Sequence, residues 1–120
     1  MTMSTHLLLV GNLSDAQADL AKATKGKDVK LMTSESIESA IKTLCSNRIE
    51  MVFISAALDL GEFFSAHREA HLNTPVVAVG GADNVQNAVS AIRLGAIEFL
   101  TTPLNTNQLT ELLDTLDTGA

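Results

Sequence analysis

The sequence has few residues of several types, and each shortage excludes a class of protein. Its 120 residues include one cysteine and two prolines but no tryptophan or tyrosine. Because Cys45 is alone, the chain cannot form an internal disulfide, and one thiolate cannot hold a structural zinc. An aromatic content of 3% argues against base stacking and against a flavin platform. No stretch approaches the ~20 apolar residues of a membrane span, and no basic segment of a signal peptide is present. We therefore expect a cytoplasmic protein without membrane contact.

Basic side chains are also scarce. Eight bases against fourteen acids give a net charge of −6, so direct contact with nucleic acid is not expected. Residues 1–68 carry eight acids and seven bases, whereas residues 69–120 carry six acids and one base, a net charge of −5. An acidic surface of this kind favours a basic partner or weak self-association, or it is simply solvated.

Apolar residues are plentiful, at 46% of the chain, and 120 residues are enough for one compact domain. Five short apolar runs alternate with helical patterns. Runs this short and this rich in Leu, Val and Ile predict strands buried on both faces of a parallel sheet. The runs are His6–Val10, Val29–Met32, Met51–Ile54, Val76–Val79 and Ile97–Leu100.

Helical periodicity lies between and after these runs. The first helix is predicted to open at Ser14, with Gln17 at a capping-box spacing, and the third to run from about Asp59 to His71. The apolar stripe of the second helix is Ile37, Ala40, Ile41 and Leu44. The fourth helix is predicted to start near Asp83, and its stripe is Val85, Ala88, Val89 and Ile92. The fifth is predicted to start at Asn105, and its stripe is Leu109, Leu112, Leu113 and Leu116.

The order is therefore an α/β chain of five βα units, (βα)5. Right-handed crossovers predict a doubly wound five-stranded parallel sheet, flavodoxin-like, with strand order 2-1-3-4-5. Chemistry in such sheets lies at the C-terminal ends of the strands. Those ends are Gly11–Asn12, Ser55–Ala57, Gly80–Ala82 and Thr101–Pro103.

At these strand ends the sequence resembles a known family. Residues 93–113, RLGAIEFLTTPLNTNQLTELL, resemble the closing segment of response-regulator receiver domains, GAxxFLxKPxxxxxL. The opening LLLVGN resembles their ILIVDD, EMVFIS resembles DLVLLD, and TPVVAVGG resembles xPVIxLTA. The resemblance runs from about His6 to Leu116, and it implies the CheY-like receiver fold.

The resemblance also locates a phosphorylation site whose chemistry has been lost. The family's acidic pair is Gly11 and Asn12 here, its phosphoacceptor aspartate is Ser55, its hydroxyl residue is Gly80, and its lysine is Thr102. Aspartyl phosphorylation needs a carboxylate nucleophile, Mg²⁺ on hard oxygen ligands and a cation near the phosphoryl group. We therefore expect no catalysis, no metal and no cofactor.

Among receivers, the chain most resembles the N-terminal domain of FlbD-type activators, which are NtrC-family, sigma-54-dependent regulators of flagellar genes. The matching features are the VGN opening, the xALDL stretch at 56–60, PVVAVGG and the lysine-free segment before Pro103. This resemblance implies that residues 1–120 are one receiver-like domain cut from a longer activator with AAA+ and DNA-binding domains. The implied partners are its own output domain, a flagellar assembly regulator and a second copy in a homodimer.

Several residues have competing interpretations. Asp15 and Asp59 are the nearest acids and could form a displaced phosphorylation site. For Asp15, in the first turn of the first helix, a favourable interaction with the helix dipole is favoured, and Asp59 lies in the loop after Ser55. Ser55 could be a site of serine phosphorylation, or it could be a neutral strand-end residue whose side chain binds a backbone group. His67 and His71, four residues apart, could present two imidazoles to zinc or form an exposed polar face.

The family also assigns two conformational positions and one surface. The Thr102–Pro103 bond is predicted to be cis, and Phe99, at the aromatic-switch position, is expected to be static. A contact surface on the fourth helix, fifth strand and fifth helix is expected to include Val85, Ala88, Ile92, Arg93, Glu98 and Glu111. The leading hypothesis is thus a non-enzymatic, phosphorylation-independent regulatory domain. The alternatives are an active receiver using displaced acids and a small-ligand-binding flavodoxin-like domain.

Overall fold

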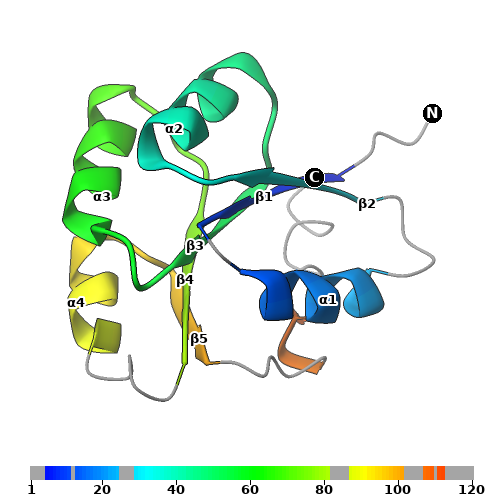
Figure 1. The fold of residues 1–120 in the computed structure, drawn as a ribbon. Coiled ribbons are helices and arrows are strands. Elements are labelled where there is room, and N and C mark those ends of the chain that lie inside the picture. The colour runs from blue at the N-terminus through cyan, green and yellow to red at the C-terminus, as the bar shows by residue number, and fades with distance from the viewer. Residues whose placement is uncertain are drawn as a thin grey trace.

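A computed structural model shows a five-stranded parallel sheet with helices on both faces (Figure 1). The structure describes residues 5–11, 13–24, 29–81, 87–101, 107–109 and 111–112. The strand order is β2-β1-β3-β4-β5, which confirms the predicted doubly wound α/β topology. None of the helices in these ranges is both long and apolar enough to cross a membrane.

The strands lie within one or two residues of the predicted runs. They are β1 (Thr5–Val10), β2 (Val29–Ser34), β3 (Met51–Ser55), β4 (Val76–Gly80) and β5 (Glu98–Thr101). The labelled helices are α1 (Ser14–Ala23), α2 (Ile37–Ser46), α3 (Leu60–Glu69) and α4 (Asn87–Leu94), and residues 107–109 and 111–112 are also helical.

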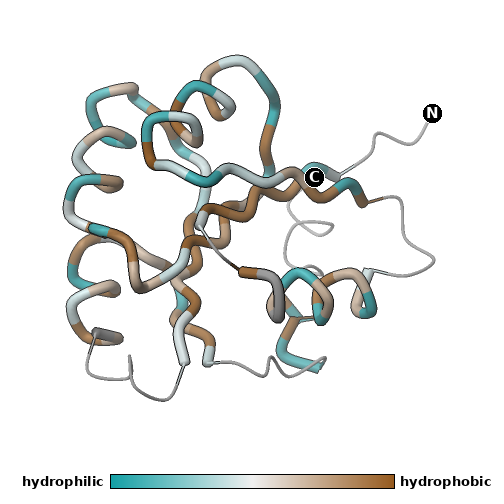
Figure 2. The backbone as a smooth tube through the Cα atoms, in the orientation of Figure 1, coloured by the Kyte–Doolittle hydropathy of each residue, from teal (hydrophilic) through white to brown (hydrophobic). Residues whose placement is uncertain are grey.

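Alternation along the strands builds two cores, one on each face of the sheet. On one face, Leu7 and Leu9 of β1 pack in a cluster with Leu20 of α1 and the fully buried Leu109. On the other face, Leu8 and other strand residues pack under α2, α3 and α4. Figure 2 shows the apolar residues along the central strands, where both layers of helices meet the sheet.

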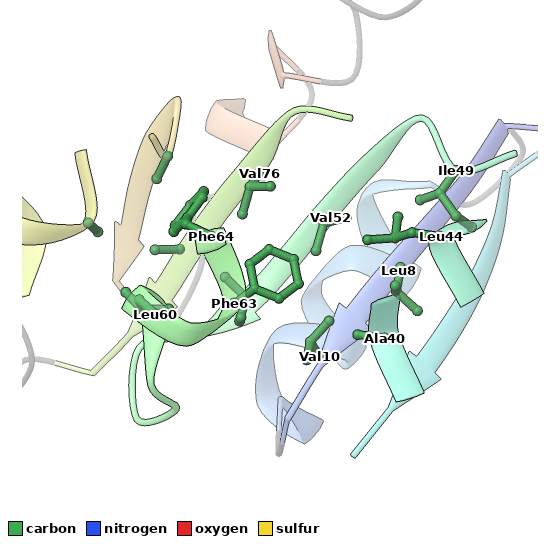
Figure 3. Close-up of a cluster of buried hydrophobic side chains, with 14 residues drawn as sticks. Leu8, Val10, Ala40, Leu44, Ile49, Val52, Leu60, Phe63, Phe64 and Val76 are labelled. Atoms are coloured by element: carbon green, nitrogen blue, oxygen red, sulfur yellow. The ribbon is translucent and has the colours of Figure 1, made fainter. Parts of the chain in front are cut away.

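The aromatic residues of α3 fill the centre of the second core. Phe63 is fully buried and Phe64 is 5% exposed, and their rings meet edge to face with centroids 5.6 Å apart. Figure 3 shows both rings lying over the strands that carry Val52 and Val76. This large contact fixes α3, and with it the loop that follows β3.

Burial on both faces holds for the central strands β1, β3 and β4 but is wrong for the two edge strands. In β2, Lys30 and Thr33 are exposed and Leu31 is half-buried, and in β5 Leu100 alone is buried. Edge strands lack a neighbour on one side, and the layers of helices do not extend fully over them.

The helix ends also differ from prediction at two places. Helix α1 begins at Ser14 as predicted, but its N-cap is Leu13, which makes no side-chain cap bond. The Gln17 N–H donates to the Leu13 carbonyl at 2.7 Å, so the capping box expected at Ser14 is wrong. Helix α3 ends at Glu69 rather than His71, and His71 adopts a left-handed backbone with φ 56°. The predicted starts of the fourth and fifth helices, Asp83 and Asn105, lie outside the described residues.

Candidate functional site

The ends of β1, β3 and β4 bring three of the predicted site positions to one edge of the sheet. Gly11 directly follows β1, Ser55 ends β3 and Gly80 ends β4, and the strand registers pair Val10 with Ile54 and Ser55 with Val79. These three residues carry no ionisable side chain. Asn12, Thr102 and Pro103 lie outside the described residues, so the predicted cis bond lies outside them as well.

Gly11 lies in a tight space that a larger residue could occupy only if its neighbours shifted. Its φ of 93° is a conformation that side chains rarely adopt, and its N–H donates to the Ser34 carbonyl at 2.8 Å. A Cβ at this position would lie 2.9 Å from the Cβ of Ser55 and 3.0 Å from Cδ1 of Leu58. The volume beside Gly11, where receivers have an acid, is therefore taken up by the side chains of Ser55 and Leu58.

The hydroxyl of Ser55 is used within its own turn. The side chain is 9% exposed, and its Oγ accepts a hydrogen bond from the Ala57 N–H at 3.2 Å. The Leu58 N–H donates to the Ser55 carbonyl at 3.1 Å, which closes the turn and directs Leu58 toward Gly11. This matches the expectation of a strand-end serine that binds a backbone group. We call Gly11, Ser55, Leu58 and Gly80 the strand-end site.

Sequence reasoning missed the part played by Leu58. In the sequence, this leucine is only part of the xALDL match at 56–60. Nothing about a single loop leucine indicates that its side chain will pack over a glycine. The contact depends on the four-residue turn Ser55–Leu58, whose length brings the side chain back over the end of β1.

The remaining candidate residues do not form a second site among the described residues, because Asp59 caps a helix and the two histidines lie apart. Asp59 is the N-cap of α3, where its Oδ1 accepts the Glu62 N–H at 3.1 Å. The side chain of Asp15 lies outside the described part of the structure. His67 Nε2 lies 3.0 Å from the Thr74 carbonyl oxygen, whereas His71 lies beyond the end of α3, so the two imidazoles do not share a helix face. Across the residues that the structure describes, no group of three His, Cys, Asp or Glu side chains could hold a metal.

A second feature, the α4–β5 groove, lies along the edge of the sheet. It has a volume of about 550 Å³ and is lined by Ala88, Val89, Ile92, Arg93, Glu98, Phe99 and Thr101. The apolar stripe predicted on this helix faces solvent, with Val89 62% and Ile92 48% exposed, whereas Ala91 is fully buried. Helix α4 therefore packs on the sheet through small residues and leaves its larger apolar side chains uncovered.

The groove gathers most of the described residues of the predicted contact surface. Ala88, Ile92, Arg93 and Glu98 line it together, whereas Glu111 is exposed on the C-terminal helical segment and is not part of the lining. Val85 lies outside the described residues. Phe99 is half-buried, packs against the core beneath α2, α3 and α4, and also lines the groove.

Comparison with known proteins finds regulatory proteins of similar sequence. No protein-family model matches the chain. The nitrogen assimilation regulatory protein NtrX of Azorhizobium caulinodans is 25% identical over 112 residues, covering 89% of this chain and 25% of that protein. The transcriptional regulatory protein FlbD of Caulobacter vibrioides is 27% identical over 99 residues, covering 82% of this chain and 22% of that protein.

The similarity to solved structures extends over nearly the whole chain. The receiver domain of NtrX from Brucella abortus superposes with a TM-score of 0.77 and 24% identity, covering 95% of this chain and 99% of that domain. The chain spans about a quarter of the length of the curated relatives it matches. The chain therefore has the CheY-like fold of response-regulator receiver domains and is similar in sequence to the regulators NtrX and FlbD.

Proposed function

We propose that this receiver domain is non-catalytic and regulates transcription without being phosphorylated. The observation that supports this is the composition of the strand-end site, where Gly11 and Ser55 replace carboxylates and Leu58 lies against both. Phosphoryl transfer to a receiver requires a nucleophilic carboxylate and oxygen ligands for Mg²⁺. An apolar side chain beside two residues without charge provides neither.

The domain would act by protein–protein contact through the α4–β5 groove. Exposed Val89 and Ile92 supply the apolar centre of such a contact, and Arg93 and Glu98 supply a charged rim. We infer that residues 1–120 form one domain of a longer cytoplasmic activator with AAA+ and DNA-binding domains. The partner would be that output domain, a flagellar assembly regulator or a second copy in a homodimer.

The first experiment tests phosphorylation. The 120-residue chain is incubated with acetyl phosphate and Mg²⁺, or with beryllofluoride, and its intact mass and thermal stability are measured beside a receiver that retains every acidic residue. We expect the control to respond and this chain to remain unchanged. Phosphate attached to this chain, or a beryllofluoride-dependent rise in its melting temperature, would overturn the proposal.

The second experiment tests the contact surface. Ile92→Asp introduces a charge into the α4–β5 groove, and Ala21→Asp introduces the same charge at an exposed position of α1 as a matched control. In sedimentation velocity we expect self-association of the wild-type chain that Ile92→Asp weakens and Ala21→Asp does not. Equal effects of the two variants on self-association would contradict the proposal that the α4–β5 groove is the contact surface.

A third measurement addresses which genes are regulated. The flagellar assignment rests on the resemblance to FlbD-type activators, whereas the relative NtrX is named for nitrogen assimilation. Transcript profiles of a strain that lacks the full-length gene would separate the two. Loss of flagellar transcripts is expected, and loss confined to nitrogen-assimilation transcripts would contradict the flagellar role.

A further inference from the structure

A separate groove lies at the opposite end of the sheet from the strand-end site. It is formed where α3 and α4 end and β4 begins, and it has a volume of about 370 Å³. We call it the α3–α4 groove, and the lining residues on which its properties depend are Phe64, His67, Arg68, Leu72, Leu94 and Ile97. None of these residues lines the α4–β5 groove.

The groove has an apolar surface that remains open to solvent. Leu94 is 36% and Ile97 is 52% exposed, and they stand on either side of Gly95. Gly95 has a φ of 131°, and a Cβ there would lie 3.4 Å from the ring of Phe64. The chain therefore turns tightly over Phe64 and holds two aliphatic side chains outward. Single exposed aliphatic residues are ordinary, but two beside one groove form a place where another apolar side chain can be buried.

The charge of the groove is opposite to that of the molecule. Among the described residues that line it, Arg68 and His67 are the basic side chains and none is acidic, although the chain carries a net charge of −6. Arg68 is exposed and makes no ion pair within the described part of the chain. His67 is fixed by its hydrogen bond to the Thr74 carbonyl, so Arg68 is the charged group free to meet a ligand.

The helix ends beneath the groove do not cancel this positive charge. The last turn of α3 has carbonyls that accept from backbone N–H groups: Ala66 from Ala70, Arg68 from His71, and His67 from Leu72. The end of α4 is closed in the same way, since the N–H groups of Gly95 and Ala96 donate to Ala91. Carbonyls that already have donors contribute less negative potential at the surface than unpaired ones.

We propose that the α3–α4 groove binds an acidic amphipathic segment of a partner protein. Aliphatic or aromatic side chains of the segment would pack on Phe64, Leu94 and Ile97, and a carboxylate would pair with Arg68. The groove takes a few side chains, whereas a stable dimer buries about 800 Å² on each partner, so a short segment suits it better than a second copy. This surface is additional to the α4–β5 groove and does not depend on the phosphorylation state of the domain.

The test selects binders without assuming their identity. The intact 120-residue chain is used to select from a displayed library of short random peptides, and the enriched peptides are synthesised and titrated by fluorescence polarisation. We expect them to combine Asp or Glu with Leu, Ile or Phe at helical spacing. Ile97→Asp and Arg68→Glu should each weaken binding by about tenfold or more, because each puts a negative charge where an acidic segment docks.

Matched controls separate this surface from the other one. Arg93→Glu and Ile92→Asp make the same chemical changes in the α4–β5 groove and should leave peptide affinity unchanged, and Arg68→Lys should retain most of it. Thermal melts establish that every variant is folded. The proposal is overturned by the absence of enriched peptides, by peptides without acidic residues, by loss of binding in Ile92→Asp but not Ile97→Asp, or by a dimer that Ile97→Asp dissociates.

Discussion

Gly11 offers the sharpest test of the strand-end site, because a single methyl group should destabilise the domain there. The residue has a φ of 93°, and a Cβ added to it would lie 2.9 Å from Ser55 Cβ and 3.0 Å from Leu58 Cδ1. The end of the Leu58 side chain can rotate away, since it is half-exposed. Ser55 Cβ cannot, because it is attached directly to the backbone of β3 in the centre of the sheet.

Two effects set the size of the change expected for Gly11→Ala. Holding a residue with a side chain in a sparsely populated positive-φ conformation costs about 1–3 kcal/mol. Forcing extra volume into a packed region costs about 1–3 kcal/mol, and here the Ser55 contact makes the strain hard to relieve. We therefore expect the free energy of unfolding to fall by roughly 2–6 kcal/mol, a large share of the stability of a small domain.

Urea denaturation followed by circular dichroism measures this difference, provided that the m-value stays constant. Gly61→Ala is the matched control, since Gly61 lies in α3 and its added Cβ would meet one side-chain atom, Asp59 Oδ1, at 3.4 Å. Alanine favours a helix over glycine by up to about 1 kcal/mol, so this variant should be neutral or more stable. If Gly11→Ala is as stable as Gly61→Ala, the geometry described for the strand-end site is wrong.

Two other positions allow similar tests of stability, one through a helix cap and one through a core cavity. Asp59→Ala removes the N-cap of α3 and should lower stability by about 1 kcal/mol in urea denaturation, whereas Asp59→Ser, which retains an acceptor, should lower it less; an equal loss in both variants would argue against capping. Phe63→Ala leaves a cavity between α3 and the sheet and should cost about 3–5 kcal/mol. A loss below 1 kcal/mol, measured by calorimetry or urea, would mean that Phe63 is not the centre of the second core.

The central part of the fold could be predicted because its sequence signals are local and mutually consistent. Short apolar runs such as Met51–Ile54, each placed between helical patterns, favour buried strands, and βα alternation with right-handed crossovers then predicts the strand order. Burial at the edge strands was not predictable in this way. The run Val29–Met32 was predicted to be buried like a central strand, and its half-exposed state depends on which strand has no second neighbour.

The face presented by α4 shows a similar limit. Its stripe of Val89 and Ile92 has the spacing of a core face, yet Ala91 is the residue that meets the sheet. Periodicity identifies an apolar face but does not say whether that face meets the protein's own sheet or another molecule. The clue lies in residue size, because Ala91 permits close packing where the bulkier stripe would hold the helix away from the sheet.

For the strand-end site, the resemblance to receivers indicates the positions at which this chain lacks the family's carboxylates, but it does not indicate which side chains fill the space there. Gly11, Ser55 and Gly80 could be located from the strand ends alone. That Leu58 lies against Gly11 follows from the turn that the Ser55 carbonyl and hydroxyl close with Leu58 and Ala57. Such a contact depends on the three-dimensional geometry of the turn, which the residue types in ALDL do not predict.

The two cores explain how a receiver fold can persist when Gly11 and Ser55 stand where the family has carboxylates. Neither hydrophobic cluster includes Gly11, Ser55 or Gly80, so the side chains that stabilise the sheet are independent of those that receivers use for phosphoryl transfer. Carboxylates crowded at one strand end repel each other and raise their own pKa values, a cost that a glycine, a serine and a leucine do not carry. Under the proposed function no phosphoryl group would shift Phe99, and Val89 and Ile92 would stay exposed on α4. A domain that acts as we propose would regulate through the partners that bind its surfaces rather than through its own covalent state.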